Sequence, residues 1–388
     1  MSFDFDQPVD RAGTHALKYD LRAQKFGRAD VAPLWIADMD FAAPECVTQA
    51  LIPRAQHPIY GYTTWPAGML DALVGWCARR HHWQVETDWL LPANGVLAAL
   101  SAALQACTQA GDGVIVQPPV YGGFVEAALA CRRQPVDNQL HEEAGHYTMD
   151  FAQLEQCARA GARTLMLCNP HNPVGRAWSR DELTELLRIA RQYGITVISD
   201  EVHGDLALPG HVHQPLAALA TAQDRVITLL SPSKTFNLQG LGLAVLATAN
   251  PELRAAVAHQ LEALHLVGAN PFAVAAAEAA WRGGDAWVDA LQTYLGATRD
   301  LLIARLPASN AIHAVPPQAS YLAWLDCRAL RKTDAELRDF FITHCGLGLN
   351  PGADYGQGGS GFMRFNFGAP RKMVETALDR IAAALKSA

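Results

Sequence analysis

The stretch that decides the fold is residues 229–237, which read Leu-Leu-Ser-Pro-Ser-Lys-Thr-Phe-Asn. It overlaps the run 226–230, which is short, apolar and rich in β-branched residues and therefore predicts a buried strand. A lysine at the end of such a strand, here Lys234, can be partly desolvated, and its amine can then act as a nucleophile. The hydroxyl groups of Ser231 and Ser233 on the same turn are suitable donors to a phosphate. This pattern is weak by itself, because most loop lysines are solvated charges.

The pattern around this stretch alternates strands with helices. We expect strands at 114–116, 164–168, 195–199, 226–230 and 243–246, and a helix that begins with the capping box Ser179/Glu182. Nearly continuous apolar strands separated by helices predict an α/β fold, with a mostly parallel sheet covered by helices on both faces. In such sheets, ligands bind beyond the carboxyl ends of the strands.

Four polar or aromatic residues follow the ends of four of these strands: Tyr121, Asn172, Asp200 and Lys234. Their convergence favours pyridoxal phosphate, which a lysine holds as a Schiff base. Lys234 would bind the cofactor and then move the proton at the substrate Cα. Asp200 would keep the pyridine nitrogen protonated, Asn172 would bind the ring hydroxyl, and Tyr121 would stack on the ring.

Two further groups complete the predicted site. Gly95 and Val96 open an Ala/Leu-rich helix, with Asn94 as its predicted N-cap, and their N–H groups would bind the cofactor phosphate together with Ser231 and Ser233. Arg364 could bind the substrate carboxylate through two parallel hydrogen bonds. Each of these residues also has an ordinary structural explanation, as a cap, a turn residue or a surface ion pair. It is their joint occurrence that points to a site.

Composition excludes several other classes of function. Half of the 388 residues are apolar and 18% are charged, as in an ordinary globular protein. The formal net charge of −7, with both signs interspersed, gives no electrostatic reason to expect nucleic acid or membrane as a partner. The eight cysteines contain no C-x-x-C pair, and we predict no metal site. Residues 1–6 are acidic and lack an apolar run, and we therefore expect reduced cysteines and a cytoplasmic protein.

The order of the elements suggests two domains. We expect a large cofactor-binding domain at 46–284, and a small α+β domain formed by 1–45 and 285–388. The first 45 residues are predicted to be irregular, and the apolar segment 34–41 within them is either a strand end or a wall of the substrate site. The small domain should contain strands at 321–325 and 362–366, a helix at 334–345 and a last helix after Pro370.

With these residues in view, the chain resembles the fold-type I pyridoxal-phosphate enzymes of the class I/II aminotransferase superfamily. Within that superfamily it is similar to the cystathionine β-lyases, or C–S lyases, of the MalY/PatB type. Short segments carry the resemblance in family order over nearly the whole chain: 10–14, 36–41, 61–63, 169–175, 199–203, 231–237, 321–326 and 361–366.

The resemblance implies further roles for individual residues. It implies a homodimer with shared active sites, in which Tyr62 reaches the phosphate bound to the neighbouring subunit. It also implies that Ala37 and Tyr321 contact the substrate beside Arg364. His203 stands three residues after Asp200, where typical aminotransferases have a tyrosine bonded to the ring oxygen. It either tunes the ring or has a purely structural role.

The reaction that the resemblance implies is α,β-elimination on a thioether amino acid such as L-cystathionine, giving a thiol, pyruvate and ammonia. One alternative is an aminotransferase, because the same residues serve both reactions. A more distant alternative is a regulatory binding protein that keeps the fold and cofactor. The sequence leaves the preferred thioether and the physiological pathway open.

Overall fold

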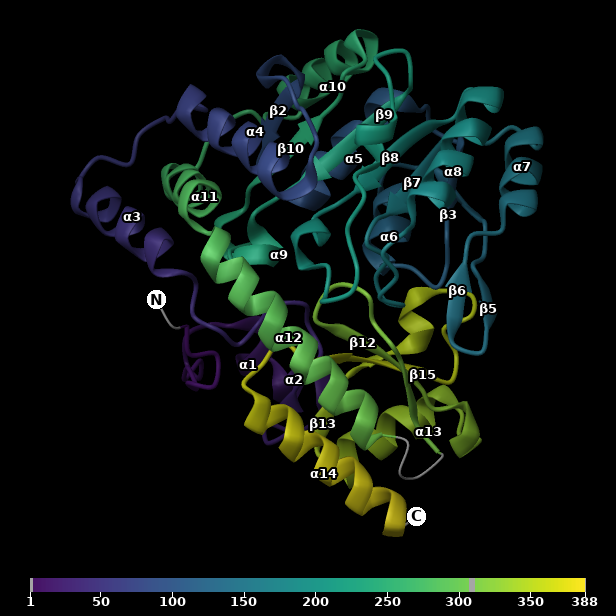
Figure 1. The fold of residues 1–388 in the computed structure, drawn as a ribbon. Coiled ribbons are helices and arrows are strands. Elements are labelled where there is room, and N and C mark those ends of the chain that lie inside the picture. Colours follow the sequence, from purple (N-terminus) through teal and green to yellow (C-terminus); the bar gives the residue numbers. More distant parts are fainter. Residues whose placement is uncertain (1–2, 307–310, 388) are drawn as a thin grey trace.

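The computed structural model describes residues 3–306 and 311–387, so residues 1–2 of the acidic start, and 307–310 and 388 of the predicted small domain, lie outside the described residues. A seven-stranded sheet forms its larger half (Figure 1). In spatial order its strands are β2 (Leu90–Ala93), β10 (Ala244–Ala247), β9 (Val226–Leu230), β8 (Thr196–Asp200), β7 (Thr164–Cys168), β3 (Gly113–Val116) and β4 (Gln134–Asp137). All neighbours pair in parallel except β10, which is antiparallel to both β9 and β2. The predicted α/β fold with a mostly parallel sheet is confirmed.

Helices cover both faces of this sheet, as the alternation of strands and helices predicts. Met166, Ile198 and Ile227 belong to a core cluster that packs on one face under α5 (Val96–Cys107), α6 (Gly122–Ala130) and α10 (Pro251–Ala263). Leu165, Leu167 and Val197 point to the opposite face, under α7 (Phe151–Arg159) and α8 (Arg180–Tyr193). Because successive strand residues point to opposite faces, one apolar run supplies both cores.

The helix boundaries follow local signals in the sequence. Helix α8 begins with the predicted capping box, in which Ser179 and Glu182 each accept a hydrogen bond from the other's backbone N–H group, and it ends at Gly194 in the left-handed conformation. Helices α3 (Glu45–Gln56), α4 (Ala67–His81) and α11 (Pro271–Gly283) pack beside one another at one side of the large sheet.

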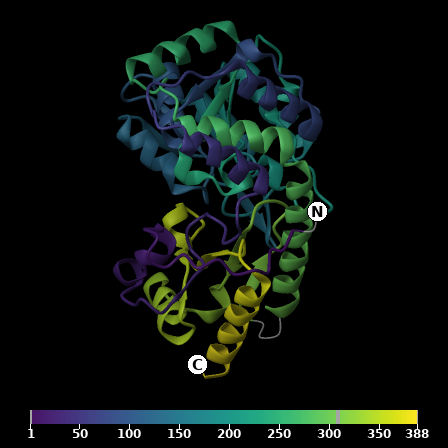
Figure 2. The same ribbon diagram turned by 90° about the vertical axis from the view of Figure 1, so that its left-hand side faces the viewer.

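A smaller antiparallel sheet lies below the large one (Figure 2). Its order is β11 (His313–Val315), β12 (Leu322–Asp326), β15 (Phe362–Asn366) and β14 (Asn350–Pro351). The long helix α12 (Asp285–Arg305) runs from the large sheet toward the small one and packs against α14 (Arg371–Ser387). Short β1 (Ala32–Pro33) pairs with β13 (Leu347–Gly348), and β5 (His141–Glu143) with β6 (His146–Thr148).

Two expectations about local structure need correction, and one open alternative is narrowed. The first 45 residues are not wholly irregular, because they form α1 (Leu17–Asp20), α2 (Arg22–Phe26) and β1. The helix predicted at 334–345 is α-helical only in α13 (Asp334–Asp339) and continues as a π-helical turn over Phe340–His344. Segment 34–41 forms no strand.

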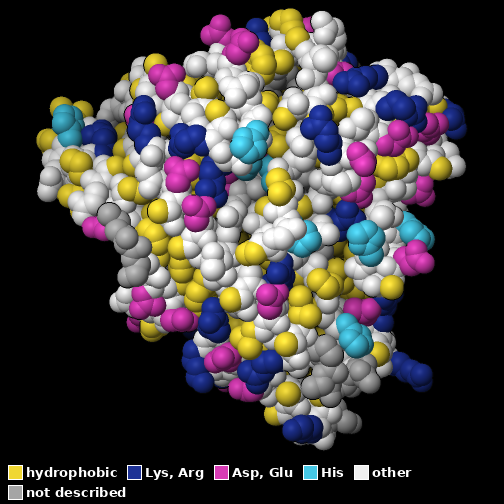
Figure 3. Space-filling model, viewed as in Figure 1, with side chains coloured by type: hydrophobic (Ala, Val, Ile, Leu, Met, Phe, Trp, Pro, Cys, Tyr) yellow, Lys and Arg dark blue, Asp and Glu magenta, His cyan; other side chains and the backbone are white. Residues whose placement is uncertain are grey.

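Across residues 3–306 and 311–387, none of the helices combines the length and apolar character needed to cross a membrane. On the face seen in Figure 3, acidic and basic side chains are intermixed, in agreement with their interspersion in the sequence.

Candidate functional site

The predicted residues meet at one edge of the large sheet. Strands β9, β8, β7 and β3 are consecutive neighbours, and Lys234, Asp200, Asn172 and Tyr121 lie at or just beyond their carboxyl ends. Lys234 lies on α9 (Ser233–Phe236), a helix of four residues that starts three residues after β9 ends. The parallel arrangement therefore places side chains that are far apart in the sequence within a few strand spacings.

The amine of Lys234 is buried and hydrogen-bonded to the main chain. Its Nζ donates to the carbonyl oxygen of Ala37 at 2.8 Å. Burial lowers the pKa of Lys234 to about 8, assisted by the positive charge of Arg364 and partly opposed by Asp38 and Asp200. A substantial fraction of the amine is therefore neutral, and hence nucleophilic, near neutral pH.

The carboxylate of Asp200 lies at the end of β8 beside this amine. Burial raises the pKa of Asp200 to about 6, although a hydrogen bond from Val202 N (3.2 Å) and the charge of Lys234 act against the shift. A buried carboxylate of this kind is stabilised by a cation placed against it.

Arg364 lies on β15 of the small sheet and faces the large one. Its Nη1 donates to Oδ1 of Asn172 (3.2 Å), and its Nη2 donates to the carbonyl of Trp35 (2.8 Å). The guanidinium lies over the ring of Tyr355, 5.2 Å from the ring centroid. Its buried Nε has no hydrogen-bond partner among the described residues. The N–H group at Nε of Arg364 is therefore available to donate a hydrogen bond to an anion.

The carbonyl of Ala37 gathers several side chains around the lysine. It accepts hydrogen bonds from Lys234, from the hydroxyl of Tyr321 (2.9 Å) and from Nε2 of Gln239 (3.2 Å). Burial raises the pKa of Tyr321, so its hydroxyl stays protonated. Segment 34–41 thus follows directly from the end of β1 and brings the carbonyl of Ala37 to Lys234.

His203 lies next to this group. Its ring centroid is 5.8 Å from that of Tyr321, and its Nδ1 is 3.1 Å from the hydroxyl of Ser320. Burial lowers the pKa of His203 well below its ordinary value, with further lowering by Lys234 and Arg364. The ring is neutral at physiological pH.

The predicted phosphate-binding end is at the start of α5. The N-cap is Gly95, with φ of +94°, and not Asn94, which is exposed and does not cap the helix. A Cβ at Gly95 would have no described atom within 4 Å, so open space lies beside the free N–H groups of the first turn. Strand β10 pairs with β9 and β2, and this places Ser231 near Gly95.

The two serines differ in their hydrogen bonds. Ser231 donates to the carbonyl of Leu243 (2.6 Å), so its proton is already used, and its oxygen lies 2.9 Å from that of Ser233. With the Ser231 proton directed to Leu243, the contact between the two serine oxygens needs the proton of Ser233.

The two tyrosines lie in contrasting places. Tyr121 is the N-cap residue of α6, half-buried near Asp200, and burial and that carboxylate raise its pKa. Tyr62 is fully exposed on the segment between α3 and α4, away from the residues around Lys234.

Sequence reasoning missed a charged network that fixes segment 34–41. Lys18 is fully buried and donates to Asp40 Oδ2 (2.7 Å) and to the carbonyl of Asp38 (3.0 Å). Arg11 pairs with the carboxylates of Asp40 (2.8 Å) and Asp38 (2.5 Å). Asn366 donates to the carbonyls of Ile36 and Asp38 on either side of Ala37. The acids inside the apolar segment 34–41 were the signal available for this network.

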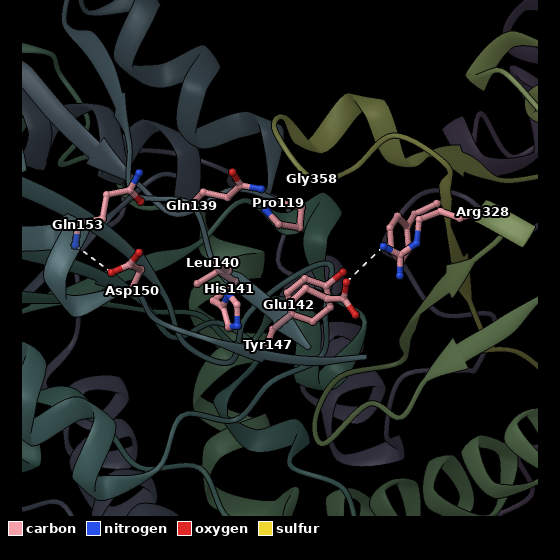
Figure 4. Close-up of a pocket in the computed structure, with 11 residues that line it drawn as sticks. Pro119, Gln139, Leu140, His141, Glu142, Tyr147, Asp150, Gln153, Arg328 and Gly358 are labelled. Carbon is pink, nitrogen blue, oxygen red and sulfur yellow. Dashed lines mark hydrogen bonds and ion pairs between the residues drawn. The ribbon is translucent and has the colours of Figure 1, made fainter. Parts of the chain in front are cut away.

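An open pocket lies elsewhere, between the β5–β6 hairpin and the small sheet (Figure 4). It has a volume of about 390 Å³, and the predicted site residues are not part of its lining. Its charged groups already have partners, because Arg328 pairs with Glu142 (3.2 Å) and Asp326 (2.7 Å), and Asp150 caps α7. We therefore place the candidate site at the sheet edge.

Comparisons with known proteins identify the family to which the chain belongs. The family model described as aminotransferase class I and II matches residues 29–381. The chain is 42% identical to cystathionine β-lyase PatB of Bacillus subtilis, over 98% of this chain and 100% of that protein.

Solved structures give the same result for the fold. Cystalysin from Treponema denticola, a structure that contains pyridoxal 5'-phosphate, superimposes with a TM-score of 0.96 at 31% identity, covering all of both chains. The pyridoxal-phosphate-bound C–S lyase from Staphylococcus hominis gives 0.92 at 29% identity, over 99% of this chain and 98% of that one. A match to most of the chain in both sequence and fold means that this protein belongs to the class I and II aminotransferase family.

Proposed function

We propose that the protein is a pyridoxal-phosphate-dependent carbon–sulfur lyase that carries out α,β-elimination on L-cystathionine or related cysteine S-conjugates. The observation that carries this proposal is the position of Lys234 and Asp200 just beyond or at the ends of neighbouring strands β9 and β8, with the lysine amine hydrogen-bonded to Ala37 and influenced electrostatically by Asp200 and Arg364. The choice of elimination is supported by the full-length similarity to PatB, which is named a cystathionine β-lyase.

The residues present fit the cofactor. Lys234 supplies the amine, and Gly95 opens α5 onto free space where a phosphate can be bound by N–H groups. The buried carboxylate of Asp200 has a raised pKa and is suited to a protonated ring nitrogen. The amide of Asn172 keeps its Nδ2 for the ring hydroxyl, because its Oδ1 already accepts from Arg364. Tyr121 would cover the ring.

The chain's own residues perform three tasks in this mechanism. Pyridoxal phosphate, when bound, supplies the ring that withdraws electrons from the substrate Cα. Arg364 binds the substrate carboxylate with its free donor and orients Cα toward Lys234. Lys234 removes the Cα proton, and departure of sulfur from Cβ then yields a thiol, with pyruvate and ammonia after hydrolysis. Ala37 and Tyr321 line the space beside this lysine.

Product analysis of the cofactor-loaded protein with L-cystathionine tests the proposal. Pyruvate, ammonia and homocysteine should form without an added 2-oxo acid. Turnover that requires the oxo acid and produces a new amino acid would instead establish the alternative, an aminotransferase.

We also propose a homodimer in which Tyr62 completes the neighbouring site. Its support is the full exposure of Tyr62, together with the exposed side chains of Ile59 and Tyr60 on the same segment and of Ile52 on α3. Such a patch is typical of an interface.

We also propose a cytoplasmic location. Its support is that all eight cysteines are free, as is usual for proteins in a reducing compartment.

Mixing two inactive variants tests the shared site. After exchange of subunits between Tyr62→Ala and Lys234→Ala, each mixed dimer would have one intact site if Tyr62 acts across the interface. With random pairing, half of the dimers are mixed, and each of these has one intact site out of two. The mixture should therefore regain about a quarter of the wild-type activity. Absence of recovery in verified mixed dimers would show that Tyr62 does not act across the interface.

A further inference from the structure

The helix that carries Lys234 is too short to hold its own position. Helix α9 contains only Ser233–Phe236, and its N-cap residue Pro232 makes no side-chain capping bond. A single turn is not stable by itself in water, since most helical stability comes from tertiary packing. The direction of Lys234 therefore depends on side-chain contacts from the residues around it.

Two side chains that follow Lys234 tie α9 to the rest of the molecule. Asn237, at the C-terminal end, accepts from Met39 N (3.0 Å) and donates to the carbonyls of Met39 (2.9 Å) and Phe41 (3.0 Å). Thr235, adjacent to the lysine and fully buried, donates from its hydroxyl to Oδ2 of Asp205 at 2.8 Å.

Asp205 is itself fixed by elements outside the cofactor site. Its Oδ1 accepts from the indole Nε1 of Trp76 (2.8 Å) and lies 2.7 Å from Nε2 of His81, both on α4. Its carbonyl accepts from Nε2 of Gln292 on α12 (2.8 Å). Only a tenth of its side chain is exposed.

The charge state of Asp205 agrees with this role. Burial acts to raise the pKa of Asp205, but hydrogen bonding to His81 and the charge of that ring, with the bonds from Thr235 and Trp76, hold the pKa below its ordinary value. The carboxylate is thus ionised and accepts hydrogen bonds from three side chains.

From this geometry we propose that Asp205 is a positioning residue for the reactive lysine and acts through the hydroxyl of Thr235. Adjacent residues on a helix are about 100° apart around its axis, so a rotation of α9 moves Thr235 and Lys234 together. The Asp205–Thr235 hydrogen bond resists that rotation. It thereby fixes the direction in which the side chain of Lys234 projects from α9. The inference rests on the proposed assignment of Lys234 as the cofactor-bearing residue.

The chain offers a matched control for the test. Thr228, on β9, is also a fully buried threonine, but its hydroxyl has no hydrogen-bond partner within the described part of the chain. Thr228→Val and Thr235→Val are thus the same change of shape and polarity, and only the second removes a hydrogen bond. Thr235→Ser restores the hydroxyl.

The experiment compares these three variants as cofactor-loaded proteins with L-cystathionine. We expect Thr235→Val to lower kcat by about tenfold to a hundredfold, the range expected when a reactive group is misplaced. It should also shift the pH titration of the visible absorbance of the lysine-bound cofactor, while the thermal midpoint of the apoprotein stays near that of Thr228→Val. Thr235→Ser should restore both kcat and the titration.

Several results would overturn the inference. Equal kcat and absorbance titrations in Thr235→Val and Thr228→Val would do so, and so would a loss in Thr235→Ser as large as that in Thr235→Val. Borohydride reduction of the wild-type protein, followed by peptide mass analysis, separates the two proposals. A cofactor attached to another lysine would refute the assignment of Lys234, whereas attachment to Lys234 with a normal Thr235→Val variant would refute only the role of Asp205.

Discussion

The ε-amine of Lys234 donates a 2.8 Å hydrogen bond to the carbonyl of Ala37, which lies 197 residues earlier in the chain. This bond joins the N-terminal segment to the edge of the large sheet. The same carbonyl accepts from Tyr321 and Gln239, so three parts of the chain meet at one acceptor.

Replacing Lys234 by alanine should abolish covalent cofactor binding and lower turnover by at least about a thousandfold, because the chain loses both the attachment point and the base. Cofactor retention after dialysis and pyruvate release measure the two effects. The exposed lysine variant Lys372→Ala should behave as wild type. Normal turnover in Lys234→Ala would refute the assignment of Lys234 as the cofactor-bearing residue and base.

Cofactor loading of the apoprotein should depend on pH through Lys234. Only the neutral amine attacks the cofactor aldehyde, and its pKa is about 8. Below that value the loading rate should rise roughly tenfold per pH unit, and it should level off above it. Stopped-flow absorbance measures the rate, and pyridoxal without the phosphate controls for titration of the phosphate. A rate independent of pH between 6 and 8 would contradict the lowered pKa.

Removing the guanidinium of Arg364 should weaken substrate use. Arg364→Ala should lower kcat/KM for L-cystathionine by over a hundredfold. This corresponds to a loss of about 3 kcal/mol in transition-state stabilisation, the cost of losing charge-assisted hydrogen bonds to the carboxylate. The matched control is Arg328→Ala, because Arg328 also lies over an aromatic ring, that of Phe362, but outside the site. Equal kcat/KM values in the two variants would show that Arg364 does not bind the carboxylate.

Breaking the buried ion pair of Lys18 should destabilise the apoprotein. Lys18→Met leaves the carboxylate of Asp40 with Arg11 as its remaining charged partner, and we expect a loss of about 3 kcal/mol in the free energy of unfolding. Urea denaturation followed by tryptophan fluorescence measures the loss. Arg28→Ala, which breaks an exposed pair with Asp30 in the same segment, should leave the midpoint unchanged. Equal midpoints in both variants would contradict a stabilising role for Lys18.

The predictable parts of the fold are those with strong periodicity. Strands β7, β8 and β9 are buried along nearly their whole length, and their apolar runs mark them to within one residue. Edge strand β4 was missed because it is short, contains Pro135, and is exposed at both ends with no fully buried residue. The division of the chain at residues 46 and 285 stays a prediction, as do the catalytic and binding roles of the individual residues.

The site residues that follow strand ends could be predicted from the sequence. Those brought together by tertiary contacts were harder to predict. Parallel strands place Asp200 and Lys234 at one edge, and the sequence alone therefore implies their proximity. Nothing in the spacing of Lys18 or Arg11 distinguishes them from surface cations, and their partners Asp38 and Asp40 are identified only when the segment folds back. Likewise, the capping role of Gly95 in place of Asn94 depends on a backbone conformation that glycine adopts easily.

The hydrogen bonds of Asn366 have a consequence for biosynthesis. This residue, near the end of the chain, holds the carbonyls of Ile36 and Asp38, and thereby the orientation of Ala37 toward Lys234. During translation, Lys234 is therefore synthesised well before Asn366, the residue that orients the main chain around it. The nascent polypeptide therefore cannot complete this pocket until Asn366 has also left the ribosome.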